Sequence, residues 1–376
     1  MQTVENIKKI YIDSSIAEGK VVHSLLERVS ADVRLEWVDD PREILEQYMH
    51  AGPVVNKTDL LVYRWPAKFL SSCPGSDGMV CCQYFVINFG IGCLFDCHYC
   101  YLQSFLNHPL MSIFGNLEDL FAELDERTRN RNFHFRIGTG EYTDSLALEP
   151  LTALSTHLVE YFAAHPNATL ELKTKSSNVD TLLDLDHNGH TVVAWSLNPP
   201  EVIAAVEDGT ANLDERLAAA ARVQAAGYKL AFHLDPLIYF EGWEAAYHGL
   251  IDRIFSVLDP DRVAWISTGS FRYAPGLKEA IQARFPDDEL TRAEMVAGPD
   301  GKQRYFKSIR EQMFRSIKEK IESVDPALFL YLCMETRRMW DRVFGFVPSS
   351  GKNLDALFDQ RRLHMEARRP TGRPQS

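Results

Sequence analysis

The strongest constraint on the fold is an alternation of short apolar segments with helical ones, which begins near Gln83 and stops near Pro286. Six segments rich in β-branched or aromatic residues are expected to be strands: Tyr84–Asn88, Phe133–Ile137, Leu170–Lys173, Thr191–Trp195, Lys229–Phe232 and Val263–Ile266. Helical stretches lie between them, over Leu117–Thr128, Pro150–Ala164, Leu213–Ala226 and Trp243–Leu258. Strand–helix units in series imply parallel strands joined by right-handed crossovers. The pattern predicts an α/β fold, either a partial (β/α)6 barrel or a doubly wound open sheet.

Polar residues follow each expected strand, and in a barrel of parallel strands such residues gather at one mouth. After the second to sixth strands these segments are Gly138–Asp144, Lys173–Ser176, Ser196–Asn198, His233–Pro236 and Ser267–Ser270. Loops are usually polar, so the pattern supports one shared site without identifying its chemistry.

Three cysteines follow the first expected strand, Cys93, Cys97 and Cys100, at the spacing Cys-x3-Cys-x2-Cys. Three thiolates on a short loop can hold three irons of a [4Fe-4S] cube and leave the fourth iron available to a small molecule. Structural zinc is the main alternative, and it needs a fourth ligand, for which His98 is the nearest candidate. A disulfide fits poorly because three is an odd number. The spacing favours an iron–sulfur cluster with one open position.

The 376 residues, 45% of them hydrophobic, suffice for a large core. Breaks in the pattern divide the chain into four parts. We expect a small N-terminal α/β segment over 1–79, the barrel over 80–286, a C-terminal α+β extension that binds substrate over 287–345, and a basic, disordered tail over 346–376.

The start of the chain lacks the basic and apolar regions of a signal peptide, and no run of about 18 uncharged apolar residues occurs. We therefore expect a cytoplasmic protein without a membrane partner, in which the seven cysteines stay reduced.

Charge is unevenly distributed along a chain whose net charge is −12. Residues 302–320 contain seven lysines and arginines against two glutamates, and the end of the chain from Arg361 is also basic. The acidic total argues against generic polyanion binding. Residues 302–320 are either a solvated helix face or a patch that contacts phosphates.

The cysteine spacing, with an aromatic residue before the last cysteine, is typical of radical S-adenosylmethionine (SAM) enzymes. Further motifs occur in order along the chain: Cys97–Gln103, Asn116–Asp119, Asp186–Thr191, Trp195–Asn198, Leu217–Lys229 and Glu241–Glu244. Together they resemble the spore photoproduct lyase family over residues 80–335.

This resemblance implies a partial (β/α)6 TIM-like barrel of the radical SAM type and a DNA repair lyase that needs no light. Its cofactors would be a [4Fe-4S] cluster and S-adenosyl-L-methionine, which on reduction yields methionine and a 5′-deoxyadenosyl radical. In the family this radical removes hydrogen from a methylene-bridged thymine dimer, which then fragments to two thymines. The partners would be DNA containing pyrimidine photoproducts and an electron donor such as flavodoxin or ferredoxin.

The resemblance also implies roles for individual residues. Cys93, Cys97 and Cys100 match the cluster ligands. The residues expected to contact SAM lie near the strand ends: Tyr99, Gly140, Glu141, Thr143, Lys175, Ser196, Asn198 and Asp235. Arg304 and Tyr305 match a region that meets the DNA lesion, which favours the phosphate-contacting interpretation of residues 302–320.

One position departs from the family pattern. Family members place a hydrogen-donating cysteine after the second strand, in a Cys-Thr-Ser-Asp pattern, where this chain has Glu141 in Glu-Tyr-Thr-Asp. A carboxylate has no weak S–H bond to give up, so Glu141 cannot replace that thiol. We expect it to bind the amino group of SAM, as the Gly-Gly-Glu element of many other radical SAM enzymes does. The candidates to quench the product radical are then Tyr101, Tyr142 and Cys333.

The departure leaves two other functions open. One is a radical SAM enzyme with a substrate other than DNA. The other is a non-catalytic iron–sulfur or zinc protein that binds nucleic acid.

Overall fold

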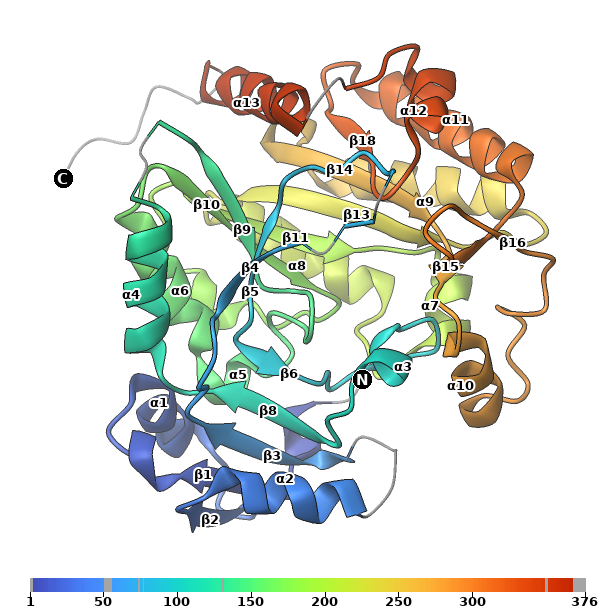
Figure 1. Ribbon diagram of the computed structural model, residues 1–376. Coiled ribbons are helices and arrows are strands. Elements are labelled where there is room, and N and C mark those ends of the chain that lie inside the picture. The colour runs from blue at the N-terminus through green and yellow to red at the C-terminus, as the bar shows by residue number, and fades with distance from the viewer. Residues whose placement is uncertain are drawn as a thin grey trace.

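The computed structural model describes residues 3–50, 56–73, 75–76, 78–129, 132–348 and 351–367. Within them, the largest sheet has eight strands in the order β18-β14-β13-β11-β10-β9-β5-β4 (Figure 1). Strand β4 (Leu70–Ser72) is antiparallel to its neighbour. The others are parallel: β5 (Phe85–Ile87), β9 (Phe135–Gly138), β10 (Ala168–Thr174), β11 (Thr191–Ser196), β13 (Lys229–Leu237), β14 (Val263–Ser270) and β18 (Leu330–Leu332).

The parallel strands are ordered in space as they are in the chain, from β5 to β18. A doubly wound sheet needs a point at which this order reverses, so that alternative is excluded. The sheet instead curves into a partial barrel, and the expected α/β barrel is confirmed. Every residue of β11 and β14 is buried, because helices cover the outer face while side chains fill the inside. All six expected strands occur, although β13 continues past Phe232 to Leu237 and so includes His233 and Asp235.

The expected helices also form, at nearly the expected bounds. Those between the barrel strands are α4 (Leu117–Arg127), α5 (Glu149–Thr152), α6 (Leu154–Ala163), α7 (Pro200–Val206), α8 (Leu213–Ala225) and α9 (Trp243–Val257). The other helices before β18 are α1 (Lys20–Arg28), α2 (Pro41–His50), α3 (Leu102–Phe105), α10 (Leu277–Arg284) and α11 (Lys307–Val324). Short 3-10 turns cover Val4–Asn6, Ser14–Ile16, Asp180–Leu182 and Pro260–Arg262. In the described part of the chain, no helix has both the length and the apolar character needed to cross a bilayer.

The N-terminal segment forms a second sheet in the order β2-β1-β3-β8-β6. Its strands are β1 (Lys9–Asp13), β2 (Arg34–Val38), β3 (Asn56–Tyr63), β6 (Gly90–Ile91) and β8 (Leu110–Phe114). Strands β6 and β8 flank the cysteine loop in the sequence, so the expected boundary at 79/80 does not separate the two sheets. Gly90 permits this pairing, because a Cβ there would lie 2.6 Å from the carbonyl oxygen of Ser112.

A small sheet in the order β15-β17-β16 follows the barrel. It consists of β15 (Arg272–Tyr273), β16 (Val296–Ala297) and β17 (Gln303–Arg304), and α11 begins just beyond it. Helix α12 (Arg337–Phe344) follows β18 and packs beside α11 (Figure 1).

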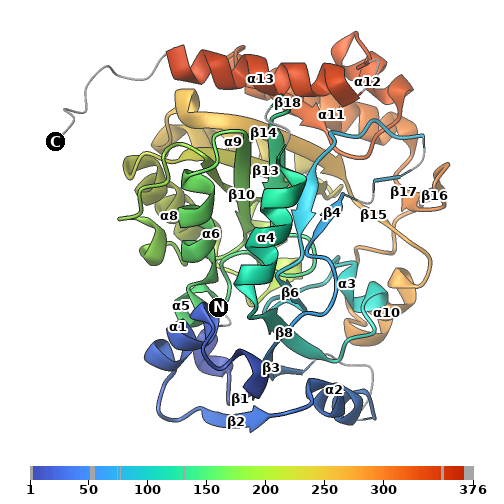
Figure 2. The same ribbon diagram turned by 60° about the vertical axis from the view of Figure 1, so that its left-hand side comes forward.

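The tail expected to be disordered contains helix α13 (Gly351–Ala367), so that expectation is wrong for these residues; 368–376 lie outside the described residues. Helix α13 lies across one end of the barrel (Figure 2). Leu354, Phe358 and Met365 are buried at helical spacing. Between them, the buried Arg361 donates to the carbonyl of Val263 at 2.9 Å. The arginine-rich composition concealed this apolar stripe, because one of its arginines is a core residue.

A polar cluster lies inside the barrel beneath the carboxyl ends of the strands. The buried carboxylate of Glu171 accepts from His233 Nε2 at 2.6 Å and from Trp265 Nε1 at 3.3 Å, and His233 Nδ1 lies 2.6 Å from the hydroxyl of Ser267. Burial opposes ionisation of Glu171, but the charge and hydrogen bond of His233 outweigh it and lower its pKa to about 2.

This cluster predicts a specific loss of stability in acid. A carboxyl whose pKa falls from 4.5 to about 2 on folding stabilises the protein above pH 4.5 and loses that contribution as the pH falls toward 2. The contribution is on the order of 3 kcal/mol. As the pH is lowered from 6 to 3, the free energy of unfolding, measured with denaturant, should therefore fall less steeply in Glu171→Gln than in the parent. Glu118→Gln, at an exposed site on α4, is the control, and identical pH profiles for all three proteins would contradict this role of Glu171.

Candidate active site

The cysteine loop is fixed by its backbone between the two sheets. It leaves the second sheet at β6 and passes through β7 (Asp96–Cys97), which pairs antiparallel with β12 (Glu207–Asp208). The N–H of Cys100 donates to the carbonyl of Cys97 at 3.0 Å, and the N–H of His98 donates to the end of α7 at 2.9 Å. The loop therefore sits beside the segment that follows β11.

His98 lies between two of the cysteines, and both of its ring nitrogens are engaged. Nε2 is 3.2 Å from Asp208, and Nδ1 contacts the buried carboxylate of Asp288. The ring stacks on Phe285 with centroids 3.7 Å apart. These contacts occupy the side chain that a zinc site would need as its fourth ligand.

The three thiols share one electrostatic environment. Burial raises the pKa of Cys93 to about 12 and that of Cys97 well above its ordinary value, whereas the nearby Lys175 favours the thiolate of Cys97. Among the described residues, no three His, Cys, Asp or Glu side chains stand at metal-binding distances. Three soft thiol donors on one anchored loop nevertheless fit the chemistry of an iron–sulfur cluster.

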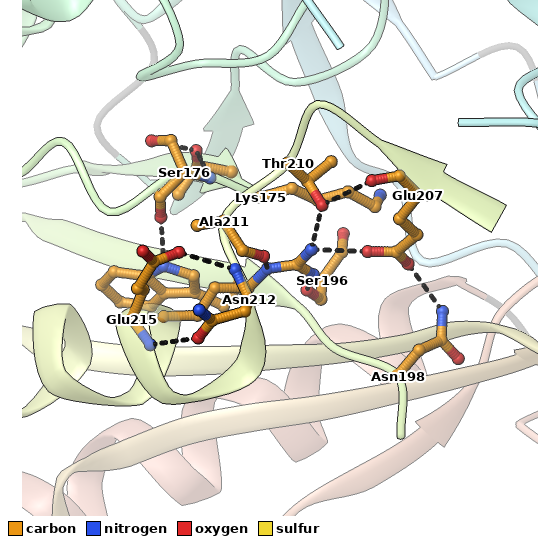
Figure 3. A network of polar contacts seen from close by, with 12 residues as sticks. Lys175, Ser176, Ser196, Asn198, Glu207, Thr210, Ala211, Asn212 and Glu215 are labelled. Atoms are coloured by element: carbon orange, nitrogen blue, oxygen red, sulfur yellow. Dashed lines mark hydrogen bonds and ion pairs between the residues drawn. The ribbon is translucent and has the colours of Figure 1, made fainter. Parts of the chain in front are cut away.

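A buried ion pair organises the residues around this loop (Figure 3). Arg216 on α8 donates to Glu207 at 2.6 Å, and both side chains are fully buried. The other carboxylate oxygen of Glu207 accepts from Asn198 at 2.9 Å and from the hydroxyl of Tyr99. Arg216 also donates to the carbonyl of Ser196 at 2.8 Å. Three of the expected SAM contacts are thus brought together by two residues that the sequence did not identify.

Lys175 lies close to this network. Its ammonium is 5.6 Å from the centroid of the Tyr99 ring. Burial lowers its pKa, but the neighbouring Cys97 and Glu207 outweigh burial and raise it above its ordinary value. Lys175 is therefore a partly buried cation beside the cysteine loop, available to an anionic group.

Sequence signals for the Glu207–Arg216 pair are weak. Arg216 is one helical turn beyond the cap of α8, where Asn212 and Glu215 form a capping box, and it occupies the apolar face of the helix. A cation on such a face indicates a buried partner, but nothing in the sequence identifies that partner as Glu207.

The segment after β9 is shaped by Asp144. Its carboxylate accepts from the N–H groups of Leu146 and Ala147, both at 2.9 Å, and from the N–H of Lys175 at 2.7 Å. Thr143 is buried, and a Cβ at Gly140 would lie 2.9 Å from the side chain of Lys173. This turn fixes the direction of the residues before it, including Glu141.

Glu141 faces the tyrosine that follows the last cysteine. The hydroxyl of Tyr101 donates to the Glu141 carboxylate at 3.0 Å. The next residue, Tyr142, stacks its ring on Phe105 with centroids 6.0 Å apart. Binding of SAM by Glu141 stays a prediction.

Two thiols lie at the same mouth, outside the cysteine loop. Cys333, at the end of β18, is 3.9 Å from a guanidinium nitrogen of Arg272, which also pairs with Asp235 at 3.1 Å. Burial raises the pKa of the Cys73 thiol to about 11, and the negative charge of the nearby Glu141 adds to this rise. Both thiols thus stay protonated at neutral pH, because burial raises the pKa of Cys333 as well.

The two expected substrate residues, Arg304 and Tyr305, are both buried at 2% exposure. Arg304 donates twice to Asp300, at 2.5 and 2.7 Å, and the hydroxyl of Tyr305 accepts from the N–H of Tyr239 at 3.2 Å. In this arrangement Arg304 braces the turn between β16 and β17, and Tyr305 joins the end of β17 to the segment that follows β13. A contact with the lesion stays a prediction.

The buried pair leads to a prediction about stability. Arg216→Met leaves the carboxylate of Glu207 buried without its partner, which should lower the free energy of unfolding by about 3–5 kcal/mol. The same change at Arg222, a half-exposed residue of α8 that pairs with Asp180, should cost less than about 1 kcal/mol. Denaturant unfolding of both variants tests this, and similar losses would show that the buried pair has no special role.

Comparison with known proteins gives a consistent result. A family model described as spore photoproduct lyase matches residues 56–331. The spore photoproduct lyase of Bacillus subtilis (strain 168) is 30% identical over 292 residues, which are 75% of this chain and 82% of that protein. That of Geobacillus sp. (strain Y412MC61) is 33% identical over 242 residues, 62% of this chain and 68% of the relative.

Solved structures agree. A spore photoproduct lyase complexed with dinucleoside spore photoproduct is 26% identical, with a TM-score of 0.74, and covers 87% of this chain and 98% of that one. A variant with bound AdoMet and the same dinucleoside gives the same identity, TM-score and coverage. The sequence match and the fold together show that this chain belongs to the spore photoproduct lyase family.

Proposed function

We propose that this protein is a radical SAM lyase that reverses a thymine photoproduct in DNA. The observation that carries the proposal is the three-cysteine loop, anchored by β7 and β12 at the mouth of a partial barrel in a chain of this family. The solved relatives with AdoMet or dinucleoside spore photoproduct bound support the same cofactor and lesion class.

The cofactors are a [4Fe-4S] cluster and SAM, and Cys93, Cys97 and Cys100 would hold the cluster. When bound, the reduced cluster and SAM supply a 5′-deoxyadenosyl radical that takes hydrogen from the lesion. The chain positions the groups around it. Lys175 offers a partly buried cation to a carboxylate, and the Glu207 network fixes Tyr99, Ser196 and Asn198 beside the loop. Glu141, Gly140, Thr143 and Asp235 are further proposed SAM contacts.

The remaining partners follow from this chemistry. A one-electron donor of the flavodoxin or ferredoxin type would reduce the cluster, and a cytoplasmic location would keep the seven cysteines in their free form. Both side chains of Arg304 and Tyr305 are buried, so their main effect on lesion binding would be indirect. They would fix the position of the β15–β17–β16 sheet and of the residues that follow it.

The last chemical step needs a hydrogen atom, which Glu141 cannot give. We propose Cys73 as its source, because this protonated thiol lies near Glu141 and Tyr142. The S–H bond would break as the product C–H bond forms, and the sulfur would regain hydrogen from the methyl group of 5′-deoxyadenosine. The 5′-deoxyadenosyl radical left by that step would rejoin methionine as SAM and return one electron to the cluster, so no outside oxidant or reductant would be consumed over the cycle. Cys333, Tyr101 and Tyr142 are the alternatives.

The activity is tested with anaerobically reconstituted, reduced protein, SAM and dinucleoside spore photoproduct. We expect loss of the photoproduct and recovery of thymine. SAM cleavage without repair would overturn the substrate and favour a radical enzyme with another substrate. Failure to bind iron and sulfide, or to cleave SAM, would overturn the enzyme assignment and favour a non-catalytic nucleic-acid-binding protein.

The hydrogen source is tested by running repair in D2O, where thiol and phenol hydrogens exchange. Deuterium should appear in the recovered thymine, and Cys73→Ala should lower repair at least about 10-fold while SAM cleavage continues. Cys333→Ala is the matched control and should keep repair and labelling. Loss of labelling only in Cys333→Ala, Tyr101→Phe or Tyr142→Phe would assign the step to that residue instead.

A further inference from the structure

Most of the basic segment 302–320 is neutralised in the folded chain. Three of its cations pair with acids four residues away, Arg304 with Asp300, Arg315 with Glu311 and Lys318 with Glu322, and two pair with remote acids, Arg310 with Glu335 and Lys320 with Asp252. Lys302 contacts Ser76 at 3.0 Å and lies 3.9 Å from Asp300. Within the described residues, Lys307 is the member of this segment for which no ion pair forms. The segment as a whole is therefore not the phosphate-binding patch that its composition suggested.

A different cationic surface forms where two helices begin. Lys307 starts α11 and the exposed Arg338 lies in the first turn of α12, which packs against α11. The exposed Arg342 lies in the last turn of α12. The three charges are close together. Partial desolvation lowers the pKa of Lys307, and the positive charges of Arg338 and Arg342 lower it further. We call these three residues the basic ridge. Arg342 donates to Glu311 at 2.7 Å, whereas Lys307 and Arg338 have no ion pair among the described residues.

The ridge is placed against the usual electrostatic preference of helices. The amino end of a helix carries partial positive charge, so acids are favoured there and cations are not. Helices α4 and α8 follow this preference, with two acids each in the first turn. Helices α11 and α12 have none, and they begin with Lys307 and with Arg337 and Arg338. Two helix ends and several cations thus add to one positive field, which is the arrangement that binds an anion.

The ridge borders the candidate active site. Phe306, whose ring is 41% exposed, separates Lys307 from the buried Tyr305. The N–H of Val80 donates to the carbonyl of Glu335 at 2.9 Å, and Met79 bridges to Thr336, the cap of α12. These contacts join the start of α12 to the segment that follows Cys73 at the barrel mouth.

We propose that the basic ridge and Phe306 bind the DNA strand next to the lesion, with Lys307 and Arg338 on its phosphates and the Phe306 ring against a neighbouring base. Guanidinium and ammonium groups bind phosphate oxygens without reading sequence, and an exposed aromatic ring stacks on any base. This inference rests on the proposed function and adds to it the surface that holds the strand outside the reacting dinucleotide.

The test compares two substrates in the full-length, reconstituted protein: the isolated dinucleoside photoproduct, and the same lesion within a duplex of about 20 base pairs. The ridge variant is Lys307→Ala with Arg338→Ala. The control is Lys318→Ala with Lys320→Ala, which removes the same charge from α11 at paired positions. Thermal unfolding of each variant checks that the fold is retained.

We expect the ridge variant to bind the lesion duplex at least about 10-fold more weakly, and the slope of log affinity against log salt to fall by about 2, because two phosphate contacts are lost. Turnover of the dinucleoside should be unchanged, and the control should match the parent. Unchanged duplex affinity and salt slope in the ridge variant, or an equal loss in the control, would overturn this inference. Failure of the parent protein to repair the dinucleoside would instead overturn the proposed function.

Discussion

The candidate site depends on one interaction, the buried ion pair between Glu207 and Arg216. A fully buried carboxylate is costly unless its charge and its lone pairs are satisfied, and here Arg216, Asn198 and Tyr99 satisfy them together. Each partner comes from a different part of the chain: α8, the end of β11 and the cysteine loop. Since β12, which carries Glu207, also pairs with β7, the same residue fixes the loop by its backbone and by its side chain. The geometry of the cysteines is therefore set by residues that touch none of their sulfur atoms, as outer-shell residues commonly do at metal sites.

The barrel could be predicted from sequence because most residues of its parallel strands are buried. Segments such as Thr191–Ser196 are continuous apolar runs, and their boundaries are visible without any long-range information. The second sheet was harder, because β6 and β8 join it by pairing between distant segments, and β6 has only two residues. Helix α13 was missed for a different reason. Its stripe includes Arg361, whose guanidinium binds the carbonyls of Val263, Ala327 and Pro260, so a core position looked like part of a solvated tail.

The candidate site was also predictable only in part. The spacing of the cysteines and the polar residues at the strand ends are local features, so both could be predicted from the sequence. The roles of the charged residues could not be predicted, because the sequence does not show which residue each charge pairs with. Arg310 and Lys320 lie in one basic segment, yet their acids are Glu335 and Asp252, far along the chain in opposite directions. Lys307 and Arg338, which form no ion pair within the described residues, come from two helices. The proposed DNA-binding surface on a chain of net charge −12 is thus what remains after ion pairs have neutralised most cations of residues 302–320.

The glutamate at position 141 affects the last step of the proposed reaction, the donation of a hydrogen atom, more than the first step, the generation of the radical. The contacts that join Tyr99, Lys175 and Asn198 to one another and to Glu207 do not involve the side chain at position 141. That side chain accepts from Tyr101, at the edge of the loop, and its charge acts on the thiol of Cys73. A thiol supplied from another segment could therefore serve the end of the reaction without disturbing the groups that begin it. The physical requirement is only that a protonated S–H lie within reach of the product, and burial keeps Cys73 in that state with a pKa of about 11. The proposed hydrogen donor thus lies on a different segment from Glu141, so a carboxylate at position 141 can bind SAM without removing that donor from the site.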